Sequence, residues 1–335
     1  MKNQSRLLKI FASLLKFAEK LPGPLQKPIQ SELKPVCELF LEQRPPVFLI
    51  AGPCSQNVRA WLGKFGSTSH AEESFAPGIE CHTSPNGAST LTLEADYSSA
   101  KTHPPDLILI GADSDNIIED IKKFLPSHMA APVFVLLPNE SLTPINRTSK
   151  SEPVSTDAPQ SVIRLSDPLL EEQICASLPR QAQLQFARFT GAKRAQAYIA
   201  SSLLKSFCAV SGVVGLQPIP LADLPVLTSI QSLMVALIIH TSGRPLRMRL
   251  AAEFLASIGA NLGLGFAFRE AARVLVRVVP FWGNAVSGFV AGAGTYAIGR
   301  AAIAYFIDDS PIQETRRLFE SIASANRKPK LNAPD

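Results

Sequence analysis

A short apolar run that ends in a glycine–proline turn most constrains how this 335-residue chain can fold. Residues Val47 to Ala51 read Val-Phe-Leu-Ile-Ala, a continuous apolar stretch with the length of a buried strand. Gly52 and Pro53 follow at once and are typical of a turn, and residues 57–65 have a pattern compatible with a helix. A strand covered on both faces, a turn and a helix form the opening unit of an α/β domain.

Further strand-length runs follow this unit, with room for helices between them. The expected strands are 89–95, 106–111, 132–137 and 161–165, and a helix is expected at 115–125. Strands separated by helix-length segments predict a parallel, doubly wound sheet. The polar segment 143–160 is rich in Pro, Ser and Thr and is expected to be a loop or an insertion.

The distribution of charge divides the chain more sharply than its net charge of +5 suggests. Residues 45–179 carry 8 basic and 16 acidic side chains, whereas residues 180–307 carry 12 basic and 3 acidic ones. The acidic half argues against nucleic acid as a partner, because Lys and Arg are what hold a phosphate backbone. In the basic half the cations flank apolar runs, which favours an anionic lipid surface.

The cysteines and histidines predict neither a metal site nor a catalytic site. The five cysteines are Cys37, Cys54, Cys81, Cys175 and Cys208. They form no C-x-x-C pair, which favours a reducing compartment over a disulfide framework or a zinc site. The four histidines of the α/β half are not accompanied by a G-x-S-x-G nucleophile turn, so no catalytic residue is assigned.

The N-terminal segment predicts two helices. Residues 5–21 carry one apolar stripe, with the lysines mostly on the other faces. This helix is interpreted either as an interfacial membrane anchor or as a helix packed on protein. A second helix is expected over residues 28–43, ended by Pro45 and Pro46.

The second half of the chain becomes helical from about residue 169, and charged residues soon become scarce. Residues 278–299 form an uncharged stretch of 22 residues, long enough to cross a bilayer core of ~30 Å. Within it, Gly288 and Gly292 make a G-x-x-x-G pair, whose spacing lets helices approach closely inside or outside a membrane. A membrane helix and a buried helix of a soluble bundle are both compatible with this pattern.

Four charged residues of the helical half are candidates for contacts with a membrane or a partner. Asp223 is a lone acid between two uncharged runs, which is read as a functional acid, a helix N-cap or an ion-pair partner. Arg269, Arg273 and Arg277 recur every fourth residue on one helical face. They could hold lipid headgroups or pair with Asp223 and Glu270.

Two parts of the chain resemble bacterial families. The sequence Arg44-Pro45-Pro46, followed by the strand up to Gly52, is similar to the lead-in of Era/dynamin-type GTPases, in which a helix ending in Arg-Pro-Pro runs into the P-loop strand. Residues 212–308 resemble the YcjF-like helical domain of unknown function that often follows such GTPases. Its matching elements are Ile219-Pro220-Leu221-Ala222-Asp223-Leu224-Pro225, the run through Met234, Val279-Pro280-Phe281-Trp282-Gly283-Asn284-Ala285-Val286 and Gly294-Thr295-Tyr296-Ala297-Ile298-Gly299-Arg300-Ala301-Ala302.

The GTPase resemblance implies a phosphate loop of the form G-x-x-x-x-G-K-[ST] that begins at Gly52. Asn57 stands at the second glycine, Val58 at the lysine and Arg59 at the hydroxyl residue. The lysine reaches the β- and γ-phosphates and the hydroxyl ligates Mg²⁺, so both ligands are missing. GTP and Mg²⁺ are therefore not expected as cofactors.

The remaining GTPase motifs are reduced to one residue each. The aspartate before the second switch corresponds to Asp96, the guanine-reading motif keeps Asn139 with Glu140 at its lysine, and the late Ser-Ala motif keeps Ser166. These residues, with Gly52 and Asn57, are the vestigial nucleotide-binding positions that the resemblance implies.

The sequence predicts an α/β domain followed by an all-α domain. The expected parts are N-terminal helices (1–44), a degenerate GTPase-like doubly wound sheet (45–178), a Gly-rich, membrane-associated YcjF-like domain (179–309) and a polar C-terminal tail (310–335). The leading hypothesis is a non-catalytic pseudo-GTPase that acts as a scaffold or regulatory partner, in the bacterial cytoplasm or on the cytoplasmic side of the inner membrane. Expected partners are an anionic lipid surface, a homologous GTPase or a second copy. The alternatives are a GTP-binding protein with a divergent site and a soluble helical interaction module.

Overall fold

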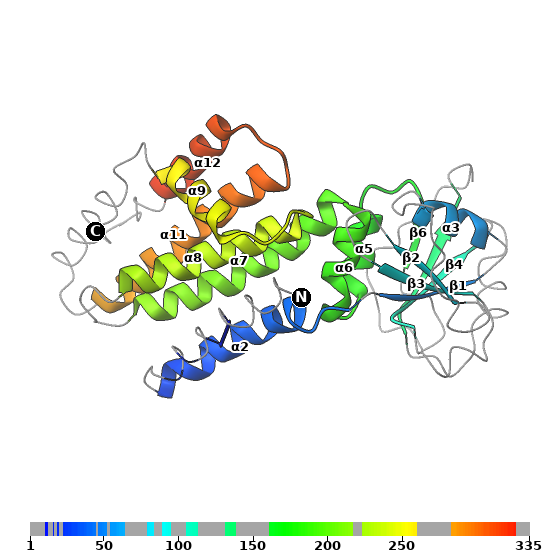
Figure 1. The fold of residues 1–335 in the computed structure, drawn as a ribbon, viewed down its shortest axis with the longest axis horizontal. Helices are drawn as coiled ribbons and strands as arrows, with labels where there is room; N and C mark the ends of the chain where they lie inside the picture. The colour runs from blue at the N-terminus through cyan, green and yellow to red at the C-terminus, as the bar shows by residue number, and fades with distance from the viewer. Residues whose placement is uncertain are drawn as a thin grey trace, which may run out of the picture. The chain divides into compact units, whose positions relative to one another are not determined.

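The chain is an α/β structure followed by helices, and it divides into two compact units (Figure 1). The computed structural model describes residues 11–12, 16, 19, 23–44, 46–51, 54–63, 79–83, 89–94, 105–112, 131–138, 161–216, 223–259 and 283–325. The α/β unit comprises Gln43–Ala195, and the helical unit comprises Met1–Glu42 together with Gln196–Asp335.

A six-stranded sheet forms the centre of the α/β unit. Its strands are β1 (Val47–Ala51), β2 (Ile79–Thr83), β3 (Ser89–Glu94), β4 (Leu107–Gly111), β5 (Val133–Leu137) and β6 (Ser161–Arg164). They lie in the order β2-β3-β1-β4-β5-β6. All neighbouring strands pair in parallel except β2, which runs antiparallel to β3 at the edge. The expected parallel sheet is therefore present, with one antiparallel strand added.

Helices cover this sheet because its central strands are apolar on both faces. Every residue of β4 and β5 is buried. Helix α3 (Ser55–Gly63) follows β1 and packs on β1 and β4. Helices α5 (Leu170–Ser177) and α6 (Arg180–Thr190) follow β6, and Phe186 of α6 meets Phe48 of β1 edge to face at 5.9 Å between ring centroids.

The strands expected from apolar runs are confirmed to within one residue, and two local features differ from expectation. Strand β2 was not expected, although Ile79 and Cys81 alternate with Glu80 and His82 in the period of two that is typical of a strand. Helix α3 begins at Ser55 rather than at Asn57. The expected helix at 115–125 and loop at 143–160 lie outside the described residues.

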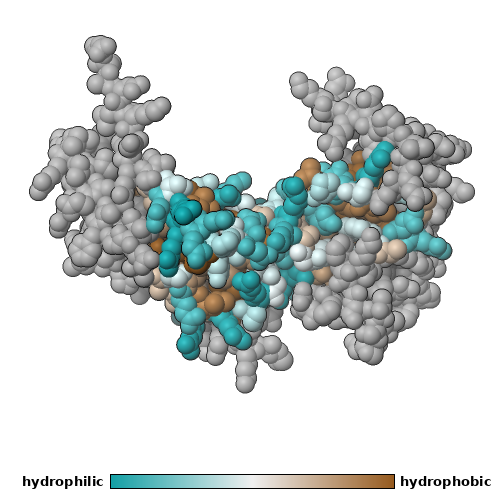
Figure 2. Space-filling model, turned by 90° about the horizontal axis from the view of Figure 1, so that it is seen from above, coloured by the Kyte–Doolittle hydropathy of each residue, from teal (hydrophilic) through white to brown (hydrophobic). Residues whose placement is uncertain are grey.

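Helices alone build the described part of the second unit. They are α2 (Gly23–Phe40), α7 (Lys193–Gly215), α8 (Asp223–Thr241), α9 (Met248–Gly259), α11 (Gly283–Phe306) and α12 (Ile312–Ala325). Helix α8 has a continuous buried stretch from Leu233 to Ile239, and α9 and α11 pack against it. In Figure 2 the described surface of the molecule mixes hydrophilic side chains with smaller apolar patches.

The N-terminal segment is described in part, and the one residue of its apolar stripe that is described is buried. Of residues 5–21, the structure describes Phe11, Ala12, Lys16 and Glu19, all helical, and Phe11 is buried while the other three are exposed. Helix α2 begins at Gly23, earlier than expected, and buries Ile29, Leu33, Val36, Leu39 and Phe40. The burial of Phe11, the one residue of the 5–21 stripe that the structure describes, matches the interpretation in which the stripe packs on protein.

The ends of the parts also differ from the expected boundaries. The α/β unit extends to Ala195 and so takes in α6 as well as α5, which already lay inside the expected boundary at residue 178. The expected polar tail is in part helix α12, which packs on α9 and α11 and buries Thr315, Phe319 and Ala323. Their spacing of four residues is the helical period, so this segment carried a signal that its polar composition masked.

Candidate functional site: the turn after the first strand

The sheet order places the turn after β1 where a ligand is usually bound in an α/β fold. Strand β1 has β3 on one side and β4 on the other, so the connections of the sheet run away from β1 in opposite directions. In open α/β sheets, ligands bind outside the carboxyl ends of the strands at such a switch point. A ligand of this sheet is therefore expected to bind at the residues after Ala51.

This turn is short. Only residues 52–54 separate the end of β1 from the start of α3 at Ser55. The N–H of Cys54 donates to the carbonyl oxygen of Gly111 at 2.9 Å, and the N–H of Asn57 donates to the carbonyl oxygen of Cys54 at 3.0 Å. A phosphate-binding loop instead turns successive N–H groups toward its ligand. The backbone N–H groups of Cys54 in the turn and of Asn57 in the first turn of α3 are thus both bonded within the protein.

Val58, the residue that the GTPase resemblance aligns with the P-loop lysine, faces the core. The Val58 side chain is 0% exposed, and Trp61 and Leu62 are buried beside it. The spacing of these three residues puts them on one face of α3, the face that packs on β1 and β4. Asn57 lies on the exposed side of the same helix. A side chain at position 58 therefore points away from the solvent that a nucleotide would enter from.

The other vestigial positions are only partly described. Ser166 is exposed in the turn after β6, where the Asp167 carboxylate accepts the N–H of Leu169 at 2.8 Å. Strand β6 lies three strands from β1, about 14 Å at ~4.8 Å per strand. Ser166 and Asn57 are thus the two of the five positions that the structure describes. Gly52, Asp96 and Asn139 lie outside the described residues.

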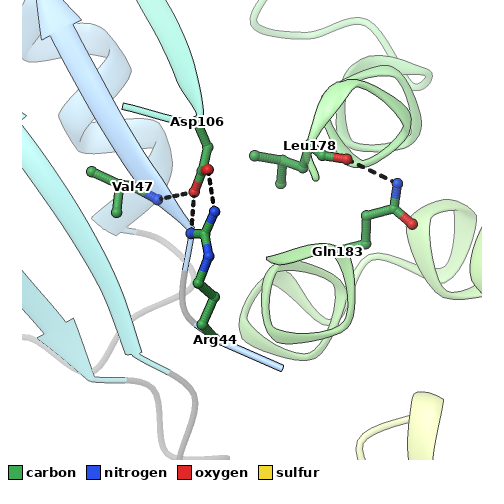
Figure 3. Close-up of polar contacts among 5 residues, drawn as sticks. All are labelled: Arg44, Val47, Asp106, Leu178 and Gln183. Carbon is green, nitrogen blue, oxygen red and sulfur yellow. Dashed lines mark hydrogen bonds and ion pairs between the residues drawn. The ribbon is translucent and has the colours of Figure 1, made fainter. Parts of the chain in front are cut away.

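The opposite edge of the sheet carries a charge pair that the sequence did not identify. The Arg44 guanidinium donates two hydrogen bonds to the Asp106 carboxylate, the longer at 2.6 Å (Figure 3). The same carboxylate accepts the N–H of Val47 at 2.9 Å, and the N–H of Arg44 donates to the carbonyl oxygen of Gln181. The hydrogen bond to Asp106 raises the pKa of Arg44.

This pair has a structural role. It joins the residues before β1, the start of β4 and helix α6, all at the amino ends of the strands. Nearby, the buried amide of Gln183 donates to the carbonyl oxygen of Leu178 at 3.0 Å, at the end of α5 (Figure 3). Both contacts satisfy polar groups at element ends. Neither lies at the carboxyl edge where ligands bind.

Burial disfavours the thiolate form of Cys37, Cys175 and Cys208. None of Cys37, Cys54, Cys175 and Cys208 is in a disulfide. Burial raises the pKa of Cys175 and of Cys37, and it raises the pKa of Cys208 from about 9 to about 12. Within the described part of the chain, no three His, Cys, Asp or Glu side chains are grouped as a metal ion would need.

In the helical unit the G-x-x-x-G pair lies at a close contact between α11 and α7. A Cβ atom at Gly288 would lie 2.8 Å from the carbonyl oxygen of Gly212, and one at Gly292 would lie 3.3 Å from that of Cys208. The expected close approach of two helices through these glycines is confirmed, and its partner is a helix of the same chain.

The other candidates in the helical unit are described only in part. Asp223 begins helix α8, while Arg269, Arg273 and Arg277 lie outside the described residues. Among the described helices, α7 alone is long and apolar enough to cross a bilayer, and half of its most apolar window is buried inside the protein. No family model matches the chain, and no curated protein matches it.

Proposed function

We propose that this protein is a non-catalytic pseudo-GTPase, in which a degenerate nucleotide-binding domain is joined to a helical unit that associates with a membrane. It acts as a scaffold or regulatory partner, with an anionic lipid surface and a homologous GTPase as its partners. The observation that carries the non-catalytic part is the complete burial of Val58 at the position of the P-loop lysine.

The chemistry of phosphoryl transfer explains why the burial of Val58 argues against catalysis. Enzymes of this kind work almost entirely by positioning the phosphates and by stabilising their charge with Lys, Mg²⁺ and backbone N–H groups. Here the lysine position is an apolar core residue, and the amides of Cys54 and Asn57 are bonded to carbonyl oxygens. The segment 45–179 carries a net charge of −8, which repels a triphosphate rather than attracting it.

Titration of the full chain with a fluorescent guanine nucleotide tests this proposal. We expect no saturable binding in the presence of Mg²⁺ and no release of phosphate from GTP. Saturable binding that is lost on removal of Mg²⁺ would contradict the proposal and would favour a GTP-binding protein with a divergent site. An intact GTPase of known nucleotide affinity serves as the positive control.

The membrane part of the proposal is supported by charge and composition. Residues 180–307 carry a net charge of +9, and α7 has the length and apolarity of a spanning helix. A soluble helical interaction module is the second candidate. It is favoured by the burial of half of that α7 window and by the use of the α11 glycines in contacts within the chain.

Fractionation of cells separates these two candidates. We expect the protein to sediment with membranes. Release by high salt would indicate electrostatic attachment, and retention after carbonate extraction would indicate an integral helix. Recovery of all the protein in the soluble fraction at low salt would reject membrane association and leave the soluble module.

A further inference from the structure

Three large apolar side chains are exposed in the described part of the chain, two of them on α11 and the third directly after the end of α7. They are Leu216 at 37%, Phe289 at 64% and Tyr296 at 45% exposure. Isolated exposed hydrophobic residues are common on soluble proteins. These three instead lie together, because the Leu216 side chain reaches Gly288, the residue next to Phe289.

The two aromatic residues form a continuous stripe on α11. Phe289, Ala293, Tyr296 and Arg300 follow at spacings of four, three and four residues, which places them on one helical face. The other faces of α11 are packed: Gly288 and Gly292 lie against α7, and Thr295 is buried, with its hydroxyl accepting the Gln231 amide of α8 at 3.2 Å.

The charges around this stripe have one sign. Arg300 ends the stripe, and the exposed Lys205 lies eleven residues before Leu216, on the same face of α7. No Asp or Glu occurs in residues 195–216 or 283–307. The surface made by Lys205, Leu216, Phe289, Tyr296 and Arg300, here called the aromatic–basic face, therefore presents apolar rings and cations without a carboxylate.

We propose that the aromatic–basic face is where this protein contacts an anionic lipid bilayer, an inference that rests on the membrane association proposed above. Phe and Tyr rings lie readily at the boundary between headgroups and acyl chains, because Tyr has an apolar body and a polar tip. Lys205 and Arg300 add attraction to anionic headgroups. A bilayer supplies apolar surface and negative charge together, with no need for a matched shape.

The test measures binding of the full chain to vesicles of phosphatidylcholine with and without phosphatidylglycerol. We expect tighter binding when phosphatidylglycerol is present. The double variant F289Q/Y296Q should bind at least about tenfold more weakly, because it removes both of the aromatic rings that would be buried in lipid. Phe289→Tyr, which keeps an aromatic ring, should retain binding. Circular dichroism and thermal unfolding of each variant confirm that it is folded.

A matched pair of charge reversals tests the electrostatic part. Lys205→Glu on α7 should weaken binding to the anionic vesicles about fivefold or more. Arg317→Glu, an equal change at an exposed position of α12, should have little effect.

The outcomes separate the two proposals. Failure of the wild-type chain to bind either vesicle would overturn the membrane association itself, and the aromatic–basic face with it. Binding by wild type that F289Q/Y296Q leaves unchanged would overturn the assignment of this face and leave the membrane association standing. Loss of self-association by F289Q/Y296Q, with vesicle binding unchanged, would assign the face to a second copy and would also overturn the lipid assignment.

Discussion

The guanidinium of Arg44 and the carboxylate of Asp106 form a two-point ion pair across 62 residues of sequence. The Asp106 side chain is 7% exposed and the Arg44 side chain is 42% exposed, so the carboxylate is buried under a cation that still reaches solvent. Because the same carboxylate accepts the N–H of Val47, the pair fixes the start of β1 against the start of β4. This contact explains the structural role of Arg44, the first residue of the Arg-Pro-Pro sequence before the strand.

Removal of the Arg44 side chain should destabilise the α/β unit. Arg44→Ala leaves the Asp106 carboxylate buried with its cation gone, and we expect a loss of about 1–3 kcal/mol in the free energy of unfolding. This expected loss of unfolding free energy is smaller than for a fully buried ion pair, because Arg44 is partly solvated. Urea denaturation measures the change, with Arg180→Ala at an exposed position of α6 as the control. A value for Arg44→Ala within about 0.5 kcal/mol of wild type would contradict this role.

Two glycines of α11 should respond to alanine in opposite directions. Gly288→Ala places a Cβ 2.8 Å from a backbone oxygen of Gly212, so α7 and α11 must separate, and we expect a loss of about 1–3 kcal/mol. At Gly294 no atom lies within 4 Å of an added Cβ. Gly294→Ala should therefore stabilise the helix by about 0.5–1 kcal/mol. Thermal unfolding compares the two, and equal effects of both would refute the close contact.

A lysine at position 58, which the GTPase resemblance aligns with the P-loop lysine, should not create nucleotide binding. Val58→Lys buries an ammonium group in the apolar face of α3, and we expect it to destabilise the unit by at least about 3 kcal/mol. Asn57→Lys, one residue earlier on the exposed side, should change stability by no more than about 0.5 kcal/mol. A folded Val58→Lys protein that binds GTP with Mg²⁺ would show that position 58 can face the nucleotide after all.

The half-buried thiol of Cys208 predicts a loss of stability in alkali. Burial raises its pKa in the folded protein from about 9 to about 12. Between these pH values the unfolded chain loses the thiol proton while the folded chain keeps it, so stability falls as the pH rises through this window. Cys208→Ala should flatten the fall, measured by urea denaturation at a series of pH values. Rapid modification of Cys208 by a thiol reagent in the folded protein near pH 8 would be incompatible with this burial.

Local sequence patterns predicted the parts of the fold that depend on local periodicity. β1, β4 and β5 are continuous apolar runs, and each was located from its residues alone. β2 was missed, although Ile79 and Cys81 alternate with Glu80 and His82, because an alternation over five residues is a weak signal until the strand is seen to pair with β3. The ion pair of Arg44 and Asp106 was not predictable, since no local pattern links residues so far apart.

The helix after β1 was located only approximately from the sequence. It was expected to begin at Asn57, whereas α3 begins at Ser55, a residue type suited to a helix start. Val58, Trp61 and Leu62 are spaced at i, i+3 and i+4, which by itself predicts that they form the buried face of the helix. The strand was located from its apolar run, and the helical period decides which way residue 58 points.

A crystal structure grown with a non-hydrolysable GTP analogue and Mg²⁺ at high concentration tests the central claim most directly. We expect α3 to begin at Ser55, the Val58 side chain to lie against β1 and β4, and no nucleotide to be bound beside Cys54. A triphosphate and its metal seated at the turn after β1, with residues 55–57 unwound around the phosphates, would contradict the account.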